Sequence, residues 1–252
     1  MASIVNNLLT DLPDGKVVEV TVGLFMTAVV VDSGGASRCG LAATLKNPEF
    51  EHAQLAAVRD SGQLEGGPAM ELASWVSSDS FTEAGVGLAT INALLPTPTD
   101  TLQLSAEDYI SKHGEQARVA LIGHFPFVPR LKTQVKELWV LELDPQDGDL
   151  PTSSAAQIIP QADILAITAT TLINHSFDGL FALRRHDARV ILLGPSTPLS
   201  PRLFDMGIHV LSGSVIEDAK KVLTLVQQGA TFHQIKNHGV RLVTLEAPKA
   251  TP

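Results

Sequence analysis

The second half of the chain alternates short apolar runs with segments of helical periodicity, and this alternation limits the fold more than any other feature. From Arg118 onward, six runs rich in Val, Ile and Leu are almost continuously apolar, as expected of strands that are covered on both faces. They are RVALIG, ELWVLEL, ADILAIT, ARVILLG, IHVLS and VRLVTL. Residues 215–228, before the last run, place apolar side chains on one helical face and end at Gly229. The pattern predicts a doubly wound parallel sheet in a domain of residues 105–252.

The first half of the chain has a different texture. Three short β-prone runs are separated by turns of a few residues, which predicts an antiparallel meander. They lie at residues 17–23, 27–32 and 36–45. With the helices that follow them, these strands indicate a small α+β domain over residues 1–98, so that the whole chain belongs to the α/β class.

Helices are expected where apolar side chains recur at helical spacing. Residues 68–77 and 81–95 show this spacing, and Ser80 with Glu83 is typical of a capping box at the start of the second helix. Gly85 and Gly87 inside it cost about 1 kcal/mol each relative to alanine, which indicates close approach of the backbone to a strand or a ligand.

The two predicted domains are separated by PTPTDTLQL, residues 96–104, which has the composition of a linker. A short helix is expected after it at residues 105–113, with Ser105 and Asp108 at its start and Gly114 at its end.

Composition and charge exclude several classes of protein. The chain is 44% hydrophobic and 18% charged, which indicates a compact fold, and its formal charge of −9 argues against a nucleic-acid-binding role. A single cysteine, Cys39, excludes an internal disulfide and a Cys-x-x-Cys site and suggests a reducing compartment. No apolar run reaches ~18 residues, and the first residues do not resemble a secretion signal. We therefore expect a soluble, cytoplasmic protein without a membrane partner.

Ligands of doubly wound sheets bind at the carboxyl ends of the strands. The residues that follow the first four predicted strands are therefore the candidates for a site. In chain order they are Gly123, His124 and Phe125, then Glu142 and Asp144, then Thr170, Thr171 and Asn174, and finally Gly194, Pro195 and Ser196.

The turn after the first strand does not fit a dinucleotide site. A G-x-G-x-x-G fingerprint would need glycine where Phe125 and Val128 stand, and Pro126 removes a backbone donor. The sequence contains no G-x-x-x-x-G-K-[ST] motif, so ordinary NAD and P-loop ATP sites are disfavoured. The eight histidines form none of the usual zinc-binding spacings, and His124 stands out only because it follows a strand.

Two interpretations stay open at the other strand ends. Glu142, in the acidic loop that continues to Asp149, has the chemistry to bind a hard cation or a ribose diol, although Asp and Gly in this loop also suit plain turns. Thr170 and Thr171 suit either a polar ligand or a helix cap. The small hydroxylated residues 194–197 suit an anion, but Pro195 withholds a donor.

Several motifs together resemble the family of putative heavy-metal chelatases. In the second half they are GHFPF (123–127), ELDP (142–145), GDLP (148–151), AD (162–163), TTLIN (170–174) and GPSTP (194–198). In the first half they are VG (22–23), TAV (27–29), GLAAT (40–44), ELASW (71–75) and GLATINA (87–93). The resemblance spans nearly the whole chain in order. It implies an enolase amino-terminal-like domain followed by a Rossmann-like domain, with a pocket between them.

The resemblance also implies a function. The first hypothesis is binding or chelation of a divalent or heavy-metal ion, or of an anionic metal complex, in the cleft between the domains. It gives His124 and Glu142 as metal ligands and predicts that these two and Asn174 converge with Thr27 and Asn92. Because Cys39 is alone, a site built mainly of thiolates is impossible within one chain.

Two other hypotheses remain. An enzyme acting on a small polar metabolite would use Glu142 or Asp144 as general acid or base. A nucleotide-derived, perhaps adenosyl, ligand fits less well because the glycine spacing is lost. A homodimer is expected only because two-fold pairs are the commonest assembly.

Overall fold

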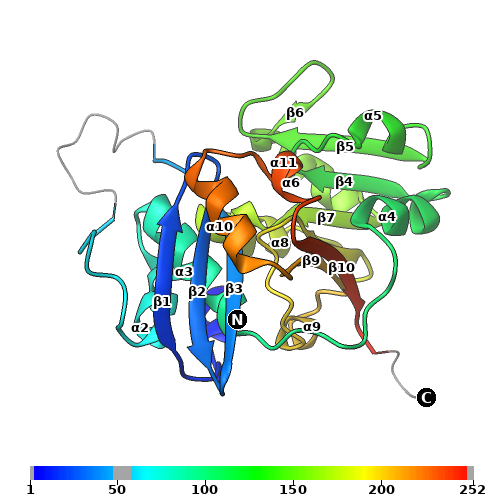
Figure 1. The fold of residues 1–252 in the computed structure, drawn as a ribbon. Coiled ribbons are helices and arrows are strands. Elements are labelled where there is room, and N and C mark those ends of the chain that lie inside the picture. Colours follow the sequence, from blue (N-terminus) through cyan, green and yellow to red (C-terminus); the bar gives the residue numbers. More distant parts are fainter. Residues whose placement is uncertain (1–2, 48–57, 249–252) are drawn as a thin grey trace.

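The computed structural model describes residues 3–47 and 58–248, which form two sheets that lie side by side (Figure 1). Within these residues the first sheet is antiparallel and has three strands in the order β1-β2-β3. The strands are β1 (Lys16–Val22), β2 (Met26–Ser33) and β3 (Ala36–Ala43). This arrangement confirms the predicted meander.

The helix α3 (Phe81–Leu94) packs on the three-stranded sheet and is almost wholly buried. The other helices of this half are α1 (Ile4–Leu9), which contacts α2 and α9 (Arg202–Asp205), and α2 (Ala69–Ser74) with the 3₁₀ turn Trp75–Ser77, which packs against α3. The glycines of α3 allow the predicted close approach of backbones. A Cβ on Gly87 would lie 2.1 Å from the backbone nitrogen of Val76, and one on Gly85 would lie 2.9 Å from the carbonyl oxygen of Ala43 in β3.

The second sheet has seven strands within the described residues, in the order β10-β9-β8-β7-β4-β5-β6. They are β4 (Arg118–Ile122), β5 (Glu137–Glu142), β6 (Leu150–Pro151), β7 (Ile164–Thr168), β8 (Arg189–Leu193), β9 (Val210–Ile216) and β10 (Val240–Glu246). From β4 the chain first adds β5 and β6 on one side of the sheet, and it then adds β7 and the later strands on the other side of β4. The strand order therefore reverses between β4 and β7, as in a Rossmann-like fold.

Short helices connect these strands. They are α4 (Ala106–Gly114), α5 (Val128–Leu131), α6 (Ala155–Ile158) between the 3₁₀ turns Thr152–Ser154 and Ile159–Gln161, α7 (Thr170–Ile173), α8 (Phe177–Ala182), α9 (Arg202–Asp205), α10 (Ala219–Gln227) and α11 (Phe232–Ile235). None of the described helices is long and apolar enough to cross a membrane.

The predicted doubly wound sheet is confirmed as a mostly parallel sheet, and the end of the chain differs in two details. The last strand, β10, pairs with β9 in antiparallel register. The helix expected at residues 215–228 begins only at Ala219, because Val215 and Ile216 continue β9 and pair with Arg241 and Val240. Strand pairing thus overrides helical periodicity at these two residues.

The position of α10 accounts for the antiparallel strand. This helix packs against β1 and β2 of the first sheet (Figure 1) instead of crossing back over the parallel sheet. The chain therefore re-enters the second sheet from the end at which it left. In the same region, the predicted linker is attached to β10, because the Leu102 N–H donates to the Thr244 carbonyl (2.8 Å).

One buried apolar cluster runs through both sheets. It includes Val29 and Ala42 of the first sheet and Leu165 and Leu192 of the second. The boundaries at residues 98 and 105 stay a prediction, and a shared core means that the two parts stabilise each other.

Candidate functional site

The loop that follows β8 joins the carboxyl edge of the parallel strands to the first sheet. The Ser196 hydroxyl accepts a hydrogen bond from the Ala43 N–H (2.9 Å), and the Asn92 Nδ2 donates to the Ser196 carbonyl (3.1 Å). A second link joins His175 Nε2, in the loop after α7, and the Ser78 carbonyl (2.9 Å). The loops after β8 and after α7 therefore contact the first half of the chain.

The turns after β4 and β8 depend on glycine. Gly123 and Gly194 have φ values of +104° and +109°, which disfavour any side chain. A Cβ on Gly123 would lie 3.1 Å from Thr168 Cβ and 3.3 Å from Phe125 Cε2. The predicted residues Gly123 and Phe125 are thus brought together around Thr168, the last residue of β7.

His124 is held in place by two carboxylates. Its backbone N–H donates to Glu142 Oε1 (2.7 Å), and its ring Nδ1 lies 2.8 Å from Asp149 Oδ2. The Asp149 side chain is only 2% exposed and also accepts the Gln146 N–H (3.1 Å). Within the described residues, no hydrogen bond engages the other ring nitrogen, Nε2, so the ring is oriented and one nitrogen stays available.

The second predicted metal ligand, Glu142, has a different environment. Its Oε2 accepts the N–H of Leu143 (2.9 Å), so both carboxylate oxygens are engaged by backbone donors. Asp144, further along the loop, is exposed. The structure therefore places His124 and Glu142 together, but it shows Glu142 fixing the backbone around His124.

The hydroxyl groups after β7 bond mainly to one another and to backbone. Thr168 Oγ1 and Thr170 Oγ1 are 3.0 Å apart, and Thr171 Oγ1 donates to the Thr168 carbonyl (2.6 Å). Asn174 Oδ1 accepts from both the N–H and the hydroxyl of Ser176. Thr171 and Asn174 are thus engaged in local contacts, but the N-cap residue of α7 is Ala169 and no described side chain caps this helix, so the capping interpretation of Thr170 and Thr171 is wrong. Thr168 lies beside the Gly123 turn.

The first-half residues implied by the family resemblance lie elsewhere. Thr27 is buried and its hydroxyl is 2.8 Å from that of Thr44. Asn92 joins β3 to the loop after β8, since its Nδ2 also donates to the Leu41 carbonyl (2.9 Å). Among the residues that the structure describes, no hydrogen bond connects His124 or Glu142 to Thr27, Asn92 or Asn174.

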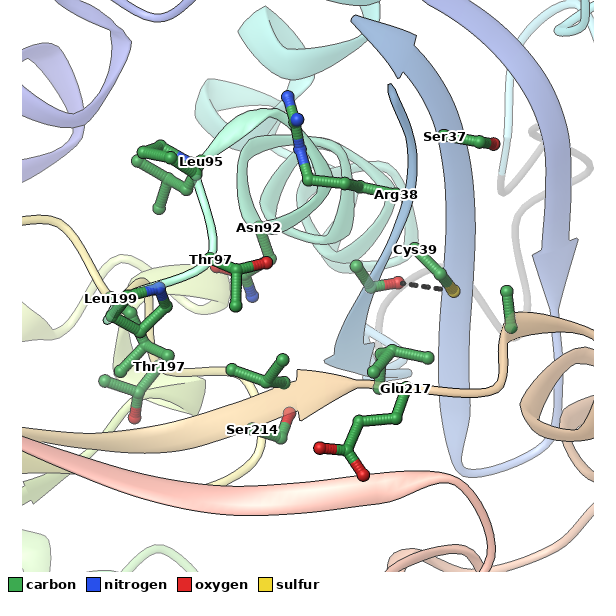
Figure 2. Close-up of a pocket in the computed structure, with 16 residues that line it drawn as sticks. Ser37, Arg38, Cys39, Asn92, Leu95, Thr97, Thr197, Leu199, Ser214 and Glu217 are labelled. Atoms are coloured by element: carbon green, nitrogen blue, oxygen red, sulfur yellow. Dashed lines mark hydrogen bonds between the residues drawn. The ribbon is translucent and has the colours of Figure 1, made fainter. Parts of the chain in front are cut away.

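A cavity of about 210 Å³ lies between β3, the end of α3 and β9. Figure 2 shows Cys39 on one wall, Asn92 and Thr97 at the end of α3, and Ser214 with Glu217 opposite. Of the predicted site residues, Asn92 lines this cavity and His124 does not. The cavity and the His124 pair are therefore separate features.

Cys39, which carries the thiol on the cavity wall, is protonated at neutral pH. Burial, with a smaller effect of Glu19, raises the pKa of the Cys39 thiol to about 12, so this group is a neutral thiol. In residues 3–47 and 58–248, no group of three or more His, Cys, Asp and Glu side chains is arranged to hold a metal ion.

Sequence reasoning missed two of the residues that shape this edge. Thr168, the last residue of β7, is not among the residues predicted from the sequence, and Asp149 enters there only as the end of the acidic loop that begins at Glu142. Asp149 stands in the GDLP motif, so the motif was a usable signal for it.

A mostly parallel, seven-stranded sheet beside a three-stranded antiparallel sheet defines a mixed α/β protein with a Rossmann-like sheet. The chain belongs to the family described as "putative heavy-metal chelation": one model of that description matches residues 106–244 and a second matches residues 5–95. The resemblance inferred from the motifs is confirmed.

Relatives agree with this assignment. An uncharacterised protein of Methanocaldococcus jannaschii is 27% identical over 229 residues, which cover 87% of this chain and 86% of the relative. A crystal structure of a DUF364-family protein of unknown function from Desulfitobacterium hafniense matches with a TM-score of 0.80 and 25% identity over 96% of this chain and 97% of the other. A second, from Pyrococcus horikoshii, has a TM-score of 0.78 at 21% identity with the same coverage and supports the fold alone.

Proposed function

We propose that this protein binds a metal complex at the carboxyl edge of the parallel sheet, with His124 as a metal ligand. The observation that carries the proposal is the pair formed by His124 and Asp149 (2.8 Å). A metal-binding histidine usually donates its other ring N–H to a carboxylate or carbonyl, which fixes the tautomer and the ring orientation. With Nδ1 protonated towards Asp149, Nε2 carries the lone pair that a metal needs.

A single oriented ring nitrogen, His124 Nε2, suits a metal complex better than a bare metal ion. A metal that arrives with its own chelating molecule needs only one or two ligands from the protein. The surrounding groups suit such a molecule: Phe125 offers an apolar wall, and the Thr168–Thr170 pair offers a hydroxyl. Gly123 and Gly194 let the backbone take positive φ values here, which brings the Gly123 turn close to Thr168 and Phe125.

In this proposal Glu142 is a positioning residue, since it holds the His124 backbone through the 2.7 Å hydrogen bond. The remaining predicted residues, namely Thr27, Asn92, Asp144, Thr171, Asn174, Pro195 and Ser196, have no assigned contact to the metal. Ser196 and Asn92 contribute by joining the two sheets.

The test uses Co(II), Ni(II) and their nitrilotriacetate complexes, which leave open coordination positions, in titration calorimetry and visible spectroscopy. We expect saturable binding that His124→Ala weakens at least tenfold and Asp149→Asn weakens by about 10–100-fold, because the ring loses its orienting partner. His233→Ala is the control, since His233 is an exposed residue of α11. If His124→Ala binds every probe as tightly as wild type, the proposal fails.

The alternative is an enzyme that acts on a small polar metabolite with Glu142 or Asp144 as acid or base. The structure offers a different acid–base group, since a histidine paired with a buried carboxylate can accept a proton at Nε2. A panel of polar metabolites incubated with wild-type protein and with His124→Ala, followed by mass spectrometry, tests this alternative. Turnover by wild type alone would favour it.

The cytoplasmic location and the two-fold dimer expected from the sequence stay predictions. Light scattering after size-exclusion chromatography tests the second, and a mass of one chain, 26.8 kDa, would contradict it.

A further inference from the structure

Two buried polar atoms beside the cavity have no hydrogen-bond partner among the residues that the structure describes. They are Oδ1 of Asn92 and Oγ1 of Thr197, and both residues line the cavity. A buried polar atom without a partner costs about 1–3 kcal/mol. Such atoms in native proteins are usually satisfied by water or by a ligand, so two of them on one cavity wall indicate what the cavity is built to hold.

The orientation of the Asn92 amide is determined by its surroundings. Its nitrogen faces two acceptors, the carbonyls of Leu41 (2.9 Å) and Ser196 (3.1 Å). Exchange of oxygen and nitrogen would set Oδ1 against both carbonyl oxygens, which is unfavourable. Oδ1 is therefore directed away from these carbonyls, and it needs an N–H or O–H donor.

Thr197 provides the complementary group. Its side chain is 2% exposed, its backbone N–H is used in a turn with the Gly194 carbonyl (3.0 Å), and its hydroxyl can donate one proton. Thr197 directly follows Ser196, which Asn92 contacts. The cavity is therefore lined by one residue with an open acceptor atom and one with an open donor hydroxyl.

The charged groups on the cavity wall are already engaged. Arg38 donates to the carbonyls of Ala93 (3.0 Å) and Leu94 (3.3 Å) at the end of α3, and Glu217 pairs with Arg241 (2.7 Å). The open hydrogen-bonding atoms are both neutral. This favours a neutral ligand over an ion.

We propose that the cavity binds a small neutral molecule through a primary carboxamide group. The amide N–H₂ would donate to Asn92 Oδ1, and the amide carbonyl would accept from Thr197 Oγ1. The volume of about 210 Å³ far exceeds the roughly 10–15 Å³ that a single water needs, so there is room for an organic group beyond the amide. The apolar side chains of Leu95, Leu199 and Val215 are among those that line the cavity.

The test follows acetamide, propionamide and isobutyramide by NMR titration of the ¹⁵N-labelled full chain. We expect saturable shifts of the Asn92 side-chain amide and of the Thr197 backbone amide. N,N-dimethylacetamide, which has no N–H for Asn92 Oδ1, should bind at least about fivefold more weakly, as expected for the loss of one hydrogen bond. Equal binding of both amide types, or no saturation with any primary amide, would overturn the proposal.

The variant Thr197→Val distinguishes a hydroxyl that binds a ligand from a hydroxyl that binds an ordered water. Valine has nearly the same shape and no hydroxyl, so we expect at least about fivefold weaker binding of propionamide together with an unchanged or higher melting temperature. If ordered water satisfies the hydroxyl instead, Thr197→Val should lower the melting temperature and leave the binding of propionamide unchanged, which contradicts the proposal.

Thr90→Val is the matched control. Thr90 is equally buried in α3, its hydroxyl donates to the Val86 carbonyl (2.8 Å), and it does not line the cavity. We expect this variant to lose stability and to bind propionamide like wild type. His124→Ala should also bind it like wild type, so the outcome at this cavity is independent of the proposed metal-complex site.

Discussion

The carboxylate of Glu83 has a different role from the capping role that the Ser80–Glu83 motif predicts. The capping box is half formed: the Ser80 hydroxyl accepts the Glu83 N–H (3.4 Å), but the Glu83 carboxylate binds Arg59 and Ser78. Burial opposes the ionised carboxylate, and the hydrogen bonds from Arg59 and Ser78 outweigh it, so that the pKa of Glu83 is lowered to about 2.

Glu83→Gln should therefore destabilise the protein at neutral pH by roughly 1–3 kcal/mol. The estimate is modest because Arg59 is half exposed and solvent screens the pair. Since the folded-state pKa lies below the unfolded one, the contribution is present above pH ~4.5 and is lost as the pH falls towards 2. Urea unfolding at pH 7 and pH 3 measures the free energy of unfolding. The difference in this free energy between wild type and Glu83→Gln should be smaller at pH 3. Glu65→Gln, at an exposed position, should leave the free energy of unfolding unchanged at both pH values.

Gly123→Ala tests the turn that begins the predicted site. The positive φ and the 3.1 Å approach to Thr168 should make this variant less stable by about 1–3 kcal/mol. Gly179→Ala in α8 is the control, because a Cβ there meets no atom within 4 Å and alanine favours a helix by about 0.5–1 kcal/mol. Thermal unfolding should give opposite signs for the two variants. A stabilised Gly123→Ala would contradict the assigned backbone conformation.

At the scale of elements, periodicity located most strands and helices but misplaced the junction between β9 and α10. Val215 satisfies a helical stripe in the sequence, yet it belongs to β9 because Arg241 of β10 pairs with it. The local signal that does mark the helix start is Asp218, whose side chain accepts the Lys221 N–H (3.0 Å). A helix cap can be predicted from the sequence because it joins neighbouring residues. The pairing of a strand with a partner more than 20 residues away cannot be predicted in this way.

Asp218→Ala removes the side chain that caps α10 and should therefore destabilise the protein. We expect a loss of stability of about 0.5–2 kcal/mol, since the first turn of α10 loses a side-chain acceptor. Equilibrium denaturation measures the loss, and Asp218→Asn should restore most of it. An unchanged midpoint for Asp218→Ala would mean that packing of α10 against β1 and β2 alone holds the helix.

At the scale of the whole molecule, Cys39 reports on the packing of α10 against the first sheet, because it belongs to the buried cluster that includes Val222 and Val226 of α10. Cys39 lies in β3 beside the cavity, is 9% exposed and has a thiol pKa raised to about 12 by burial. Because the thiolate is the reactive form, native protein at pH 8 should react with a disulfide reagent such as dithionitrobenzoate far more slowly than unfolded protein. Rapid labelling of the native protein would show that α10 separates readily from the first sheet.

Much of this molecule follows from short-range pattern. Apolar runs, caps and turn glycines located the meander, the buried helix α3 and the strands of the second sheet. The same reasoning identified His124 because a polar residue after a buried strand has few structural reasons to be there. Motifs in order along the chain were enough to identify the family, since each motif reflects a local backbone requirement.

Contacts between distant residues decided the rest. The direction of β10 depends on α10 packing against the first sheet, the environment of His124 depends on Asp149 from another loop, and the cavity exists only where β3, α3 and β9 meet. Hydrogen bonds such as that from Asn92 to Ser196 join residues about a hundred positions apart. Periodicity carries no information about such pairs, because the geometry that brings them together is set when the two sheets bury a common core.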